Sequence, residues 1–400
     1  MRIEELDISN VLLYVGDAVR YDSLNKRVDE MGITFKTISQ SIHTPTSFGS
    51  MLTGCIPPKT GVYWFRDRLP DALDTMFDLP NHNCDFVHTD SALQRTHGGS
   101  LAKLLKVDTA TKEPLADYET PFVWVERGPG GHAPYGREPM KSAQEYWDQT
   151  LPASEERLKS EYRGGIHRDY EVFTDRLDTL EERGLLEETL VIYASDHGEA
   201  LTEHGIIGHN GPIRPEVVYT PTVFIHPELD DSHGGVIRNM DLYPTIRSLL
   251  GYSEQSHVDG EKIWNLREPV RGTVHYSQGF DITRNYSSRI GILDDIINPT
   301  FDQHALFDKT GGYVKRFSSD SEQLGIALGN LFFSSLAPQY RREPYKAFSN
   351  FMKNQWICGL PSFETDEALS TIKSARNTEQ FAESNAGEVR TEELKHLGYL

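Results

Sequence analysis

Two short segments of the 400-residue chain place ligand-forming side chains directly after apolar runs. Asp17 follows residues 11–15, and Asp196 and His197 follow residues 190–194. Carboxylate oxygen and imidazole nitrogen form the ligand set of Mn²⁺ or Zn²⁺, with Mg²⁺ or Ca²⁺ as alternatives, and the histidine favours the transition metals. The sequence therefore predicts a divalent cation site. The alternative interpretation is that each aspartate after a strand is a helix N-cap.

A threonine lies between these two segments, in a loop that leads into a predicted helix. Thr44 belongs to the stretch HTPTSFGSMLTG, residues 43–54. At the start of a helix, backbone N–H groups and the helix dipole favour an anion. A hydroxyl is a poor nucleophile at neutral pH unless a base or a metal lowers its pKa, so Thr44 requires the predicted ion. The alternative is an ordinary helix cap.

The elements that would position these side chains alternate along the chain. Apolar runs predict buried strands at residues 11–15, 122–125, 190–194 and 222–225. Helical spacing of apolar residues predicts helices over residues 170–183 and 241–250. This order predicts an α/β fold with a mostly parallel sheet sandwiched by helices. In such a sheet the ligand site lies outside the carboxyl ends of the strands, where the candidate residues fall.

The character of the sequence changes after about residue 268. We predict a metal-binding catalytic domain over residues 1–268 and a smaller α+β portion over residues 269–400. Residues 273–277 and 288–293 are short strand-like segments, and a polar, helix-prone acidic tail follows them. The smaller portion is therefore expected to combine short antiparallel strands with helices.

The charge and composition exclude several classes of partner. The net charge is −20, from 60 acidic and 40 basic side chains, and no cluster of Lys and Arg suited to phosphate backbones is present. We therefore expect neither nucleic acid nor an anionic membrane surface as a partner. The acidic start MRIEELDISN and the absence of a long apolar run predict a cytoplasmic protein. Three widely spaced cysteines are consistent with a reducing compartment.

Five segments, taken in order, resemble a known family. They are GDAVRYD, the segment ending in SMLTG, ERGLLEETLVIYASDHGEALTEHGIIGH, YTPTVFIHP and DLYPTIRSLLG. Together they are similar to the sulfatase family of the alkaline phosphatase superfamily, from about residue 10 to residue 251. HALFDKTGG and the closing ELKHLGYL resemble the tail of that family more weakly.

The resemblance implies a role for the metal-binding residues. Asp17 matches the first metal-binding aspartate of the family, and Asp196 with His197 matches its second pair of ligands. Thr44 occupies the nucleophile position beside the metal. The GPGG before His132 lacks the carboxylate that a second metal would need. One metal ion is therefore expected.

The resemblance also implies residues that bind the substrate. Arg20 matches an arginine that contacts the nucleophile and the anionic group of the substrate. His132 resembles a histidine near the scissile ester. His209 lies where members place a lysine or histidine that binds the transferred group or protonates the leaving oxygen. Lys59 and Asn210 are predicted to line the same pocket. The implied partner is a small anionic ester.

Three departures from the family pattern shape the prediction. Sulfatases carry a cysteine or serine that is oxidised to formylglycine, and Thr44 stands in that place but cannot be converted. The family's G-K-x-H-x-G segment is also missing near residues 85–99, where His88, Arg95 and His97 lie, and whether these reach the site stays open. Cys55 lies in a stretch, CIPPK, that mimics the formylglycine motif, but it follows the predicted helix and is interpreted as structural.

These departures favour phosphoryl chemistry. The predicted function is a metal-dependent hydrolase of phosphate or sulfate esters, with the phosphoester favoured and Thr44 as nucleophile. Three alternatives stay open: a sulfuric ester hydrolase, a transferase that moves a phosphoryl group onto a glycan or lipid, and a degenerate protein that binds an anion without turnover.

Overall fold

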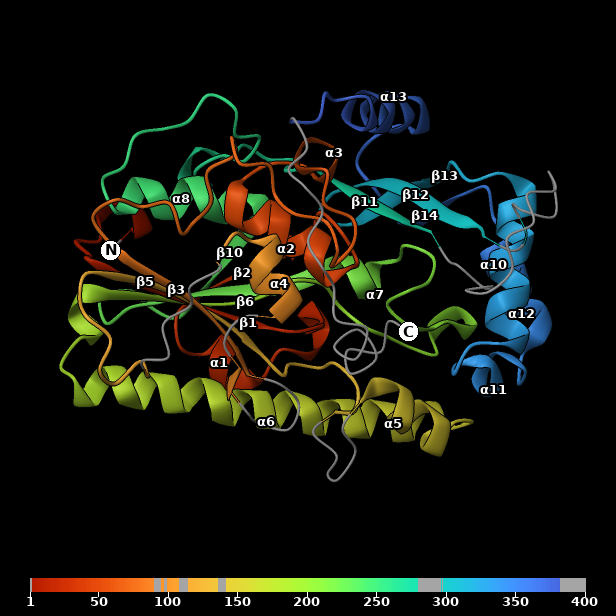
Figure 1. Ribbon diagram of the computed structural model, residues 1–400, viewed down its shortest axis with the longest axis horizontal. Helices are drawn as coiled ribbons and strands as arrows, with labels where there is room; N and C mark the ends of the chain where they lie inside the picture. Colours follow the sequence, from red (N-terminus) through yellow and green to blue (C-terminus); the bar gives the residue numbers. More distant parts are fainter. Residues whose placement is uncertain are drawn as a thin grey trace.

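The computed structural model describes residues 2–89, 95–96, 99–107, 114–135, 142–279, 296 and 298–381. Within these residues, helices cover both faces of a large sheet, and a second sheet lies beside it (Figure 1). The α/β fold predicted from the alternating pattern, with a smaller C-terminal antiparallel sheet, is confirmed.

The large sheet has eight strands and is mostly parallel. From one edge to the other they are β10 (Ser232–Arg238), β2 (Ile33–Ile38), β9 (Tyr219–Ile225), β6 (Thr189–Ser195), β1 (Asn10–Gly16), β5 (Phe122–Gly128), β3 (Asn83–Thr89) and β4 (Arg95–Thr96). Only β9 and β4 run antiparallel to their neighbours. The strand predicted over residues 222–225 is therefore present as β9, but it runs against the others.

The register of the central strands brings the predicted ligands together. β1 pairs in parallel with β6, and Gly16 lies opposite Ser195 at the end of the ladder. On its other side β1 pairs with β5, where Gly16 lies opposite Gly128. The next residues, Asp17 and Asp196, therefore leave the sheet at one edge, on neighbouring strands.

Alternating side chains of β1 enter two different hydrophobic cores. On one face, Val11, Leu13 and Val15 pack with α2 (Thr44–Thr53), α4 (Gly99–Leu104) and α8 (Leu242–Leu249). On the other face, Leu12 and Tyr14 pack with the long helix α6 (Glu155–Glu182). Figure 1 shows these helices on opposite sides of the sheet. Both faces of the strand are therefore buried, as the continuous apolar run indicates.

One buried carboxylate of α6 joins three of the segments that carry the site. Asp169 accepts hydrogen bonds from the hydroxyl of Tyr14 on β1 (2.8 Å), the hydroxyl of Tyr193 on β6 (2.6 Å) and the backbone N–H of Gly130 after β5 (2.8 Å). Burial raises its pKa from 3.8 to about 6, although these hydrogen bonds act in the opposite direction.

Asp169 makes the stability of the protein depend on pH. Because its folded pKa is raised, its stabilising contribution is complete below about pH 4 and is lost as the pH rises through about 6. The loss is roughly 3 kcal/mol. In the Asp169→Asn variant the amide oxygen accepts from Tyr14 and Gly130 and the amide nitrogen donates to Tyr193, so this loss is absent. Urea unfolding of both metal-free proteins between pH 4 and 7 measures it, and a constant difference between them would contradict the assignment.

The second sheet is antiparallel, in the order β11 (Gly272–Gly279), β12 (Thr300–Phe307), β13 (Gly311–Arg316) and β14 (Gln355–Gly359). One face packs on α13 (Thr365–Arg376), and the other shares a core with the large domain. The predicted segment 273–277 lies in β11, whereas residues 288–293 are outside the described part of the chain. Because both parts contribute to one core, the boundary at residue 268 stays a prediction.

The remaining elements are short or peripheral. They comprise α1 (Lys26–Asp29), α3 (Pro57–Thr60), α5 (Ala143–Thr150), α7 (Pro215–Val218), α10 (Asp320–Phe332), α11 (Ala337–Tyr340), α12 (Pro344–Phe351), and the two-stranded pair β7 (Ala200–Leu201) and β8 (Ile207–Gly208). Figure 1 shows α10, α11 and α12 at the end of the molecule beside the second sheet.

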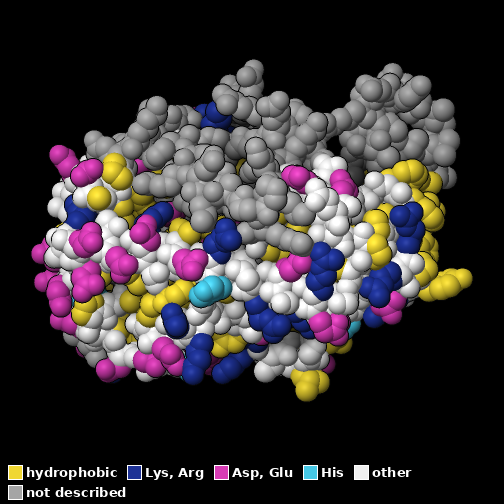
Figure 2. All heavy atoms as spheres, turned by 90° about the horizontal axis from the view of Figure 1, so that it is seen from below, with side chains coloured by type: hydrophobic (Ala, Val, Ile, Leu, Met, Phe, Trp, Pro, Cys, Tyr) yellow, Lys and Arg dark blue, Asp and Glu magenta, His cyan; other side chains and the backbone are white. Residues whose placement is uncertain are grey.

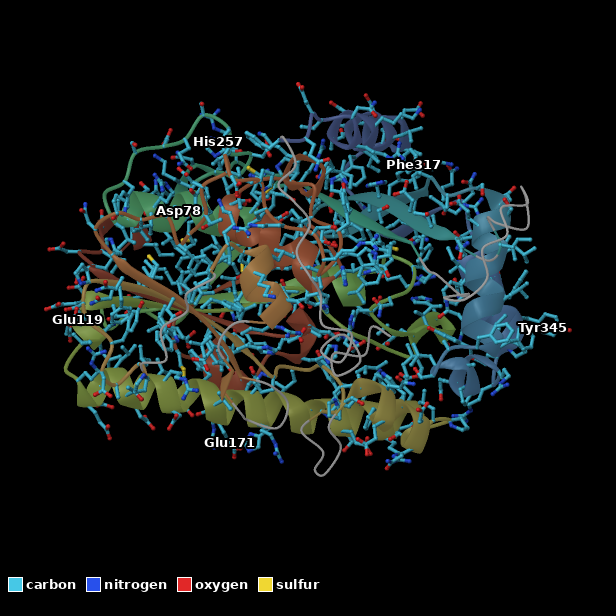
Figure 3. All side chains as sticks on the ribbon, in the orientation of Figure 1. Asp78, Glu119, Glu171, His257, Phe317 and Tyr345 are labelled. Atoms are coloured by element: carbon cyan, nitrogen blue, oxygen red, sulfur yellow. The ribbon has the colours of Figure 1, made fainter. Side chains whose placement is uncertain are left out.

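Several exposed acidic side chains lie on the solvent face of α6. Figure 2 shows this side of the molecule, with acidic side chains gathered on its left half. Figure 3 shows Glu171, one of the exposed acidic residues of α6, pointing away from the sheet. Among the helices that the structure describes, none has both the length and the apolar character needed to cross a membrane.

Candidate active site

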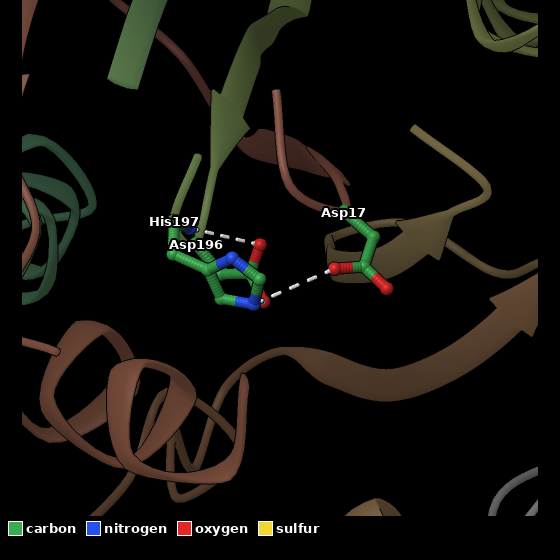
Figure 4. A group of neighbouring side chains, drawn as sticks. All are labelled: Asp17, Asp196 and His197. Carbon is green, nitrogen blue, oxygen red and sulfur yellow. Dashed lines mark hydrogen bonds and ion pairs between the residues drawn. The ribbon is translucent and has the colours of Figure 1, made fainter. Parts of the chain in front are cut away.

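Asp17, Asp196 and His197 meet at the carboxyl end of β1 and β6 (Figure 4). One potential ligand atom from each residue lies within 4.8 Å of the other two. Nε2 of His197 lies 3.7 Å from Oδ1 of Asp17 and 3.6 Å from Oδ2 of Asp196. All three side chains are buried. The structure thus brings together the three residues that the sequence predicts as metal ligands.

The chemistry of this cluster fits a divalent cation. Oδ1 of Asp17 and Oδ2 of Asp196 are buried and accept no hydrogen bond from the described residues. Nδ1 of His197 lies 2.9 Å from the carbonyl oxygen of Gly198, which only accepts, so Nδ1 carries the hydrogen and Nε2 presents its lone pair. Two unpaired carboxylate oxygens and one imidazole lone pair therefore converge. Burying them without a compensating charge is costly, and a cation would supply that charge.

The two aspartates differ in their electrostatic surroundings. Burial alone would raise the pKa of Asp17, but Arg127 and nearby histidines hold it well below its ordinary value. Burial raises the pKa of Asp196, because His197 and the backbone offset the loss of solvent only in part. Oδ1 of Asp196 accepts from the N–H groups of Ala18 (3.1 Å) and His197 (3.0 Å), which fixes the carboxylate.

Thr44 lies at the first turn of α2, directly beside the cluster. Its hydroxyl oxygen is 3.1 Å from Nε2 of His197. The helix begins after His43, with Pro45 in its first turn, and ends at Gly54, whose φ of 71° closes the last turn. The Ser47 hydroxyl donates to the carbonyl oxygen of Asp196 at 2.6 Å and so ties the helix to the end of β6. The N-terminal N–H groups of α2 face the same region as the ligands.

Three histidines form a row beside Thr44. The ring of His209 lies 4.4 Å from that of His197 and 5.2 Å from that of His132. Burial, together with the neighbouring histidines, holds the pKa of His209 well below its ordinary value. Both residues that the resemblance assigns to the scissile ester therefore lie at the predicted site.

A glycine allows the loop that carries His132 to reach this position. Gly130 has a φ of 55°, and a Cβ there would lie 1.9 Å from the carbonyl oxygen of Asp17. The N–H of Gly131 donates to that same oxygen at 2.7 Å. Only glycine permits this approach, so the GPGG sequence after β5 places His132 beside Asp17.

Two buried charged residues of the site were not predicted from the sequence. Arg127, at the end of β5, donates from Nη2 to Oδ2 of Asp17 and from Nη1 to Nε2 of His88 at 2.9 Å. Glu199 lies 3.3 Å from Nδ1 of His209, and burial raises its pKa to about 8. In the sequence, Arg127 could have been found as part of a charged Glu-Arg pair at the end of an apolar strand. Glu199 could have been found as a glutamate directly after Asp-His-Gly.

Loss of Arg127 is expected to destabilise the metal-free protein in particular. The Arg127→Met variant leaves the buried Asp17 carboxylate without its partner, which costs about 3–5 kcal/mol. A bound cation offsets that charge, so saturating Mn²⁺ should recover much of the loss. Urea unfolding with chelator and with Mn²⁺ measures both values. The double variant Arg127→Met, Asp17→Asn is the matched control. An equal loss with and without Mn²⁺ would contradict the electrostatic role.

The Arg20 guanidinium is paired with carboxylates. It does not contact Thr44: Nε and Nη2 donate to Asp22 at 2.8 and 2.6 Å, and Nη1 donates to Glu203 at 2.7 Å. The guanidinium follows these carboxylates because the pairing compensates for its burial. A direct contact with the substrate would require both ion pairs to open.

Lys59 is also paired with a carboxylate, whereas Asn210 lies beside His209. The Lys59 ammonium group pairs with Asp259 at 2.9 Å and donates to the carbonyl oxygen of His257. It follows the far end of α2, roughly 15 Å along the helix from Thr44. Asn210 is half-buried next to His209, and its side-chain oxygen lies 3.4 Å from the hydroxyl oxygen of Tyr276.

His88, Arg95 and His97, which lie where the family has its G-K-x-H-x-G segment, are only partly described by the structure. His88 reaches the site through Arg127, as its 2.9 Å contact shows. The side chain of Arg95 and the whole of His97 lie outside the described residues. Cys55 is buried after the far end of α2, where burial raises the pKa of its thiol to about 12. Both its place and its pKa agree with a structural role.

The chain matches a family model and two relatives of known name. The sulfatase family model matches residues 97–252. The chain is 31% identical over 354 residues to Agl7, a low-salt glycan biosynthesis sulfotransferase of Haloferax volcanii, covering 84% of this chain and 82% of that protein. It is 25% identical to an ulvan-active sulfatase of Formosa agariphila, over 63% of this chain and 47% of that protein.

Solved structures of the same fold include proteins named for two different activities. A putative sulfatase from Bacteroides thetaiotaomicron aligns with a TM-score of 0.57 and 13% identity, over 77% of this chain and 83% of that one. The phosphonate monoester hydrolase of Agrobacterium radiobacter aligns with a TM-score of 0.55 and 13% identity, over 86% and 96%. At these identities the likeness establishes the fold alone.

Proposed function

The chain belongs to the sulfatase family, and on that premise we propose that it cleaves a small phosphate or sulfate ester at a divalent metal ion, with Thr44 accepting the transferred group. The observation that carries this proposal is the position of the Thr44 hydroxyl. It lies 3.1 Å from Nε2 of His197, within the converging ligand cluster and at the first turn of α2. A hydroxyl held between a cation site and a helix N-terminus is suited to nucleophilic attack on an anion.

Asp17, Asp196 and His197 would hold the ion, with the Thr44 oxygen beside them. A bound divalent ion lowers the pKa of a neighbouring hydroxyl and offsets the charge of the transferred group. The donor set favours Mn²⁺ or Zn²⁺. Arg127 orients Asp17 by binding Oδ2, which leaves Oδ1 directed at the ligand cluster.

The histidines beside Thr44 supply the remaining proton transfer. As the Thr44 oxygen forms its bond to phosphorus or sulfur, the bond to the leaving oxygen breaks, and His132 or His209 would take up the proton that the threonine loses. The same proton would then pass from the imidazole to the leaving oxygen. Nδ1 of His132 lies 2.7 Å from the carbonyl oxygen of Ala133, so its Nε2 is the nitrogen available to the substrate.

A phosphate ester is the first candidate substrate. Threonine cannot become formylglycine, and the group on Thr44 must therefore leave by attack of water or another hydroxyl on phosphorus or sulfur. A phosphothreonine can be opened in this way at the same metal site. The reaction then consumes one phosphate ester and one water, and releases an alcohol and phosphate.

Transfer of a sulfuryl group to a sugar hydroxyl is the second candidate. It is favoured by the relative named as a glycan biosynthesis sulfotransferase, which is aligned over 82% of its length. The site needs no additional group for this reaction, because an acceptor hydroxyl replaces water in the second step.

An ester panel distinguishes these candidates. Purified protein with Mn²⁺ is given p-nitrophenyl phosphate, bis-p-nitrophenyl phosphate or p-nitrophenyl sulfate, each with and without a hexose acceptor. Release of nitrophenol from the phosphate without acceptor supports hydrolysis. Release from the sulfate that requires the hexose, with a sulfated sugar as product, supports transfer. No release from any ester under either condition would refute both.

A further inference from the structure

Beside the row of histidines, the second sheet contributes a wall of uncharged polar side chains. We propose that Asn210, Tyr276 and Gln278 form a hydroxyl-binding wall that recognises a sugar-like alcohol as leaving group or acceptor. The proposal rests on the proposed function, because it assigns the alcohol part of the ester that Thr44 would attack. It names a substrate class that the catalytic residues themselves do not determine.

The wall lies next to the histidines and the threonine of the proposed site. Asn210 directly follows His209, one of the two histidines proposed to protonate the leaving oxygen. Its side-chain oxygen lies 3.4 Å from the hydroxyl oxygen of Tyr276, which donates its hydrogen to Oε1 of Gln278. The Tyr276 ring also lies 6.4 Å from the ring of His43, the residue before Thr44. The wall therefore adjoins both the nucleophile and the proton donor.

Tyr276 is held rigidly, so its hydroxyl has a defined position. Phe301, on the neighbouring strand β12, packs edge-to-face on its ring at 5.6 Å. The hydroxyl lies 2.8 Å from Oε1 of Gln278, two residues further along β11 and on the same face. The three polar groups come from β11 and from the loop after β8, and they form one continuous chain of contacts.

Gln278 carries the observation that points to a ligand. Its side chain is 2% exposed, and its Nε2 has no hydrogen-bond partner among the described residues. A buried amide donor without a partner lowers stability, so an acceptor oxygen placed beside it is favourable. A sugar hydroxyl or ring oxygen supplies one. The wall has no charged member, which favours hydroxyls over a second anionic group.

Leaving group and acceptor would use the same wall. In the first step the phosphoryl or sulfuryl group moves from the alcohol oxygen to Thr44. In the second step it moves from Thr44 to an oxygen in the same position, so the second step is the reverse of the first. An alcohol that leaves from beside His209 and an alcohol that attacks from there therefore meet the same side chains. A hydrolase would use the wall in the first step, and a transferase would use it in both.

Binding to an inactive protein tests the wall independently of turnover. In the Thr44→Ala background, isothermal titration measures the affinity for glucose 6-phosphate, glucose 6-sulfate and inorganic phosphate, with Mn²⁺ present. Adding Gln278→Met or Tyr276→Phe should weaken binding of the preferred sugar ester by about tenfold, the effect of one lost hydrogen bond. Affinity for inorganic phosphate should stay within about twofold, since neither side chain reaches the anionic group.

Ser277→Ala is the matched control, because Ser277 lies between these two residues on the opposite face of β11. It should leave both affinities unchanged. Unchanged affinity for both sugar esters in the Gln278 and Tyr276 variants would overturn the wall, and so would an equal loss for sugar ester and inorganic phosphate. Failure of the proposed function is seen separately, as turnover by Thr44→Ala itself. Thermal unfolding of each variant shows that it is folded.

Discussion

Replacing Thr44 by alanine is expected to reduce kcat by at least about 10³-fold, the scale of effect seen when a catalytic nucleophile is removed. The hydroxyl is the one group beside the ligand cluster that would form a bond to phosphorus or sulfur, and it lies 3.1 Å from Nε2 of His197. The measurement is the initial rate with the best ester of the panel at saturating Mn²⁺.

Two variants control this result. Thr44→Ser keeps the hydroxyl and should retain activity within about one order of magnitude, the scale on which positioning errors act. Thr46→Ala removes a second buried threonine hydroxyl from the same turn of α2 and should leave the rate nearly unchanged. Thermal unfolding confirms that each variant is folded. Full activity of Thr44→Ala would refute the nucleophile assignment.

Replacing Asp196 by asparagine is expected to abolish both metal binding and turnover while the fold is preserved. The amide oxygen still accepts from the N–H groups of Ala18 and His197, so the local hydrogen bonds survive. The oxygen that would bind the metal, Oδ2, is replaced by an NH₂ group. Affinity for Mn²⁺ should fall by more than about 100-fold, a loss that changes around metal ligands already cause.

The same substitution should have the opposite effect on the metal-free protein. Burial raises the pKa of Asp196, and its charge lies close to Asp17, so removing that charge should increase the free energy of unfolding in chelator. Mn²⁺ should raise the melting temperature of the wild type and leave that of Asp196→Asn unchanged. Asp175→Asn, on the exposed face of α6, is the control for loss of one acidic charge. Equal stabilisation of both proteins by Mn²⁺ would place the ion elsewhere.

The core of the candidate site could be predicted because the sequence shows where its buried strands end. Asp17 and Asp196 directly follow apolar runs, and parallel strands place such residues at one edge of the sheet. Thr44 precedes a helix of small and apolar residues, which locates its hydroxyl at the helix start. These three assignments depend on backbone position, which apolar patterning specifies well.

The direction of long side chains and the direction of one strand could not be predicted from the sequence. Arg20 and Lys59 have flexible side chains, and each turned to carboxylates that are distant in sequence, Glu203 and Asp259. The apolar run that became β9 is compatible with either strand direction, because both faces of the sheet are buried. β2 was not predicted: its sequence, ITFKTI, mixes polar and apolar residues, and only part of it is buried.

Asp169 could have been identified from the sequence as a polar residue at an apolar position of a helix. It lies on the apolar face of α6, in phase with Tyr162, Ile166 and Phe173. A carboxylate at such a position must have buried partners, and the tyrosines that close β1 and β6 provide them. Polar residues in the apolar phase of a helix are therefore candidates for groups that position a site.

The most direct test of the central claim is the mass of the peptide that contains Thr44, taken from enzyme quenched in acid during steady-state turnover. The claim predicts a fraction of this peptide heavier by one phosphoryl or sulfuryl group, with fragmentation locating the group on Thr44. The heavier peptide should be absent without Mn²⁺ and in Thr44→Ala. A group found on another residue, or undiminished turnover by Thr44→Ala without any modified peptide, would contradict the account.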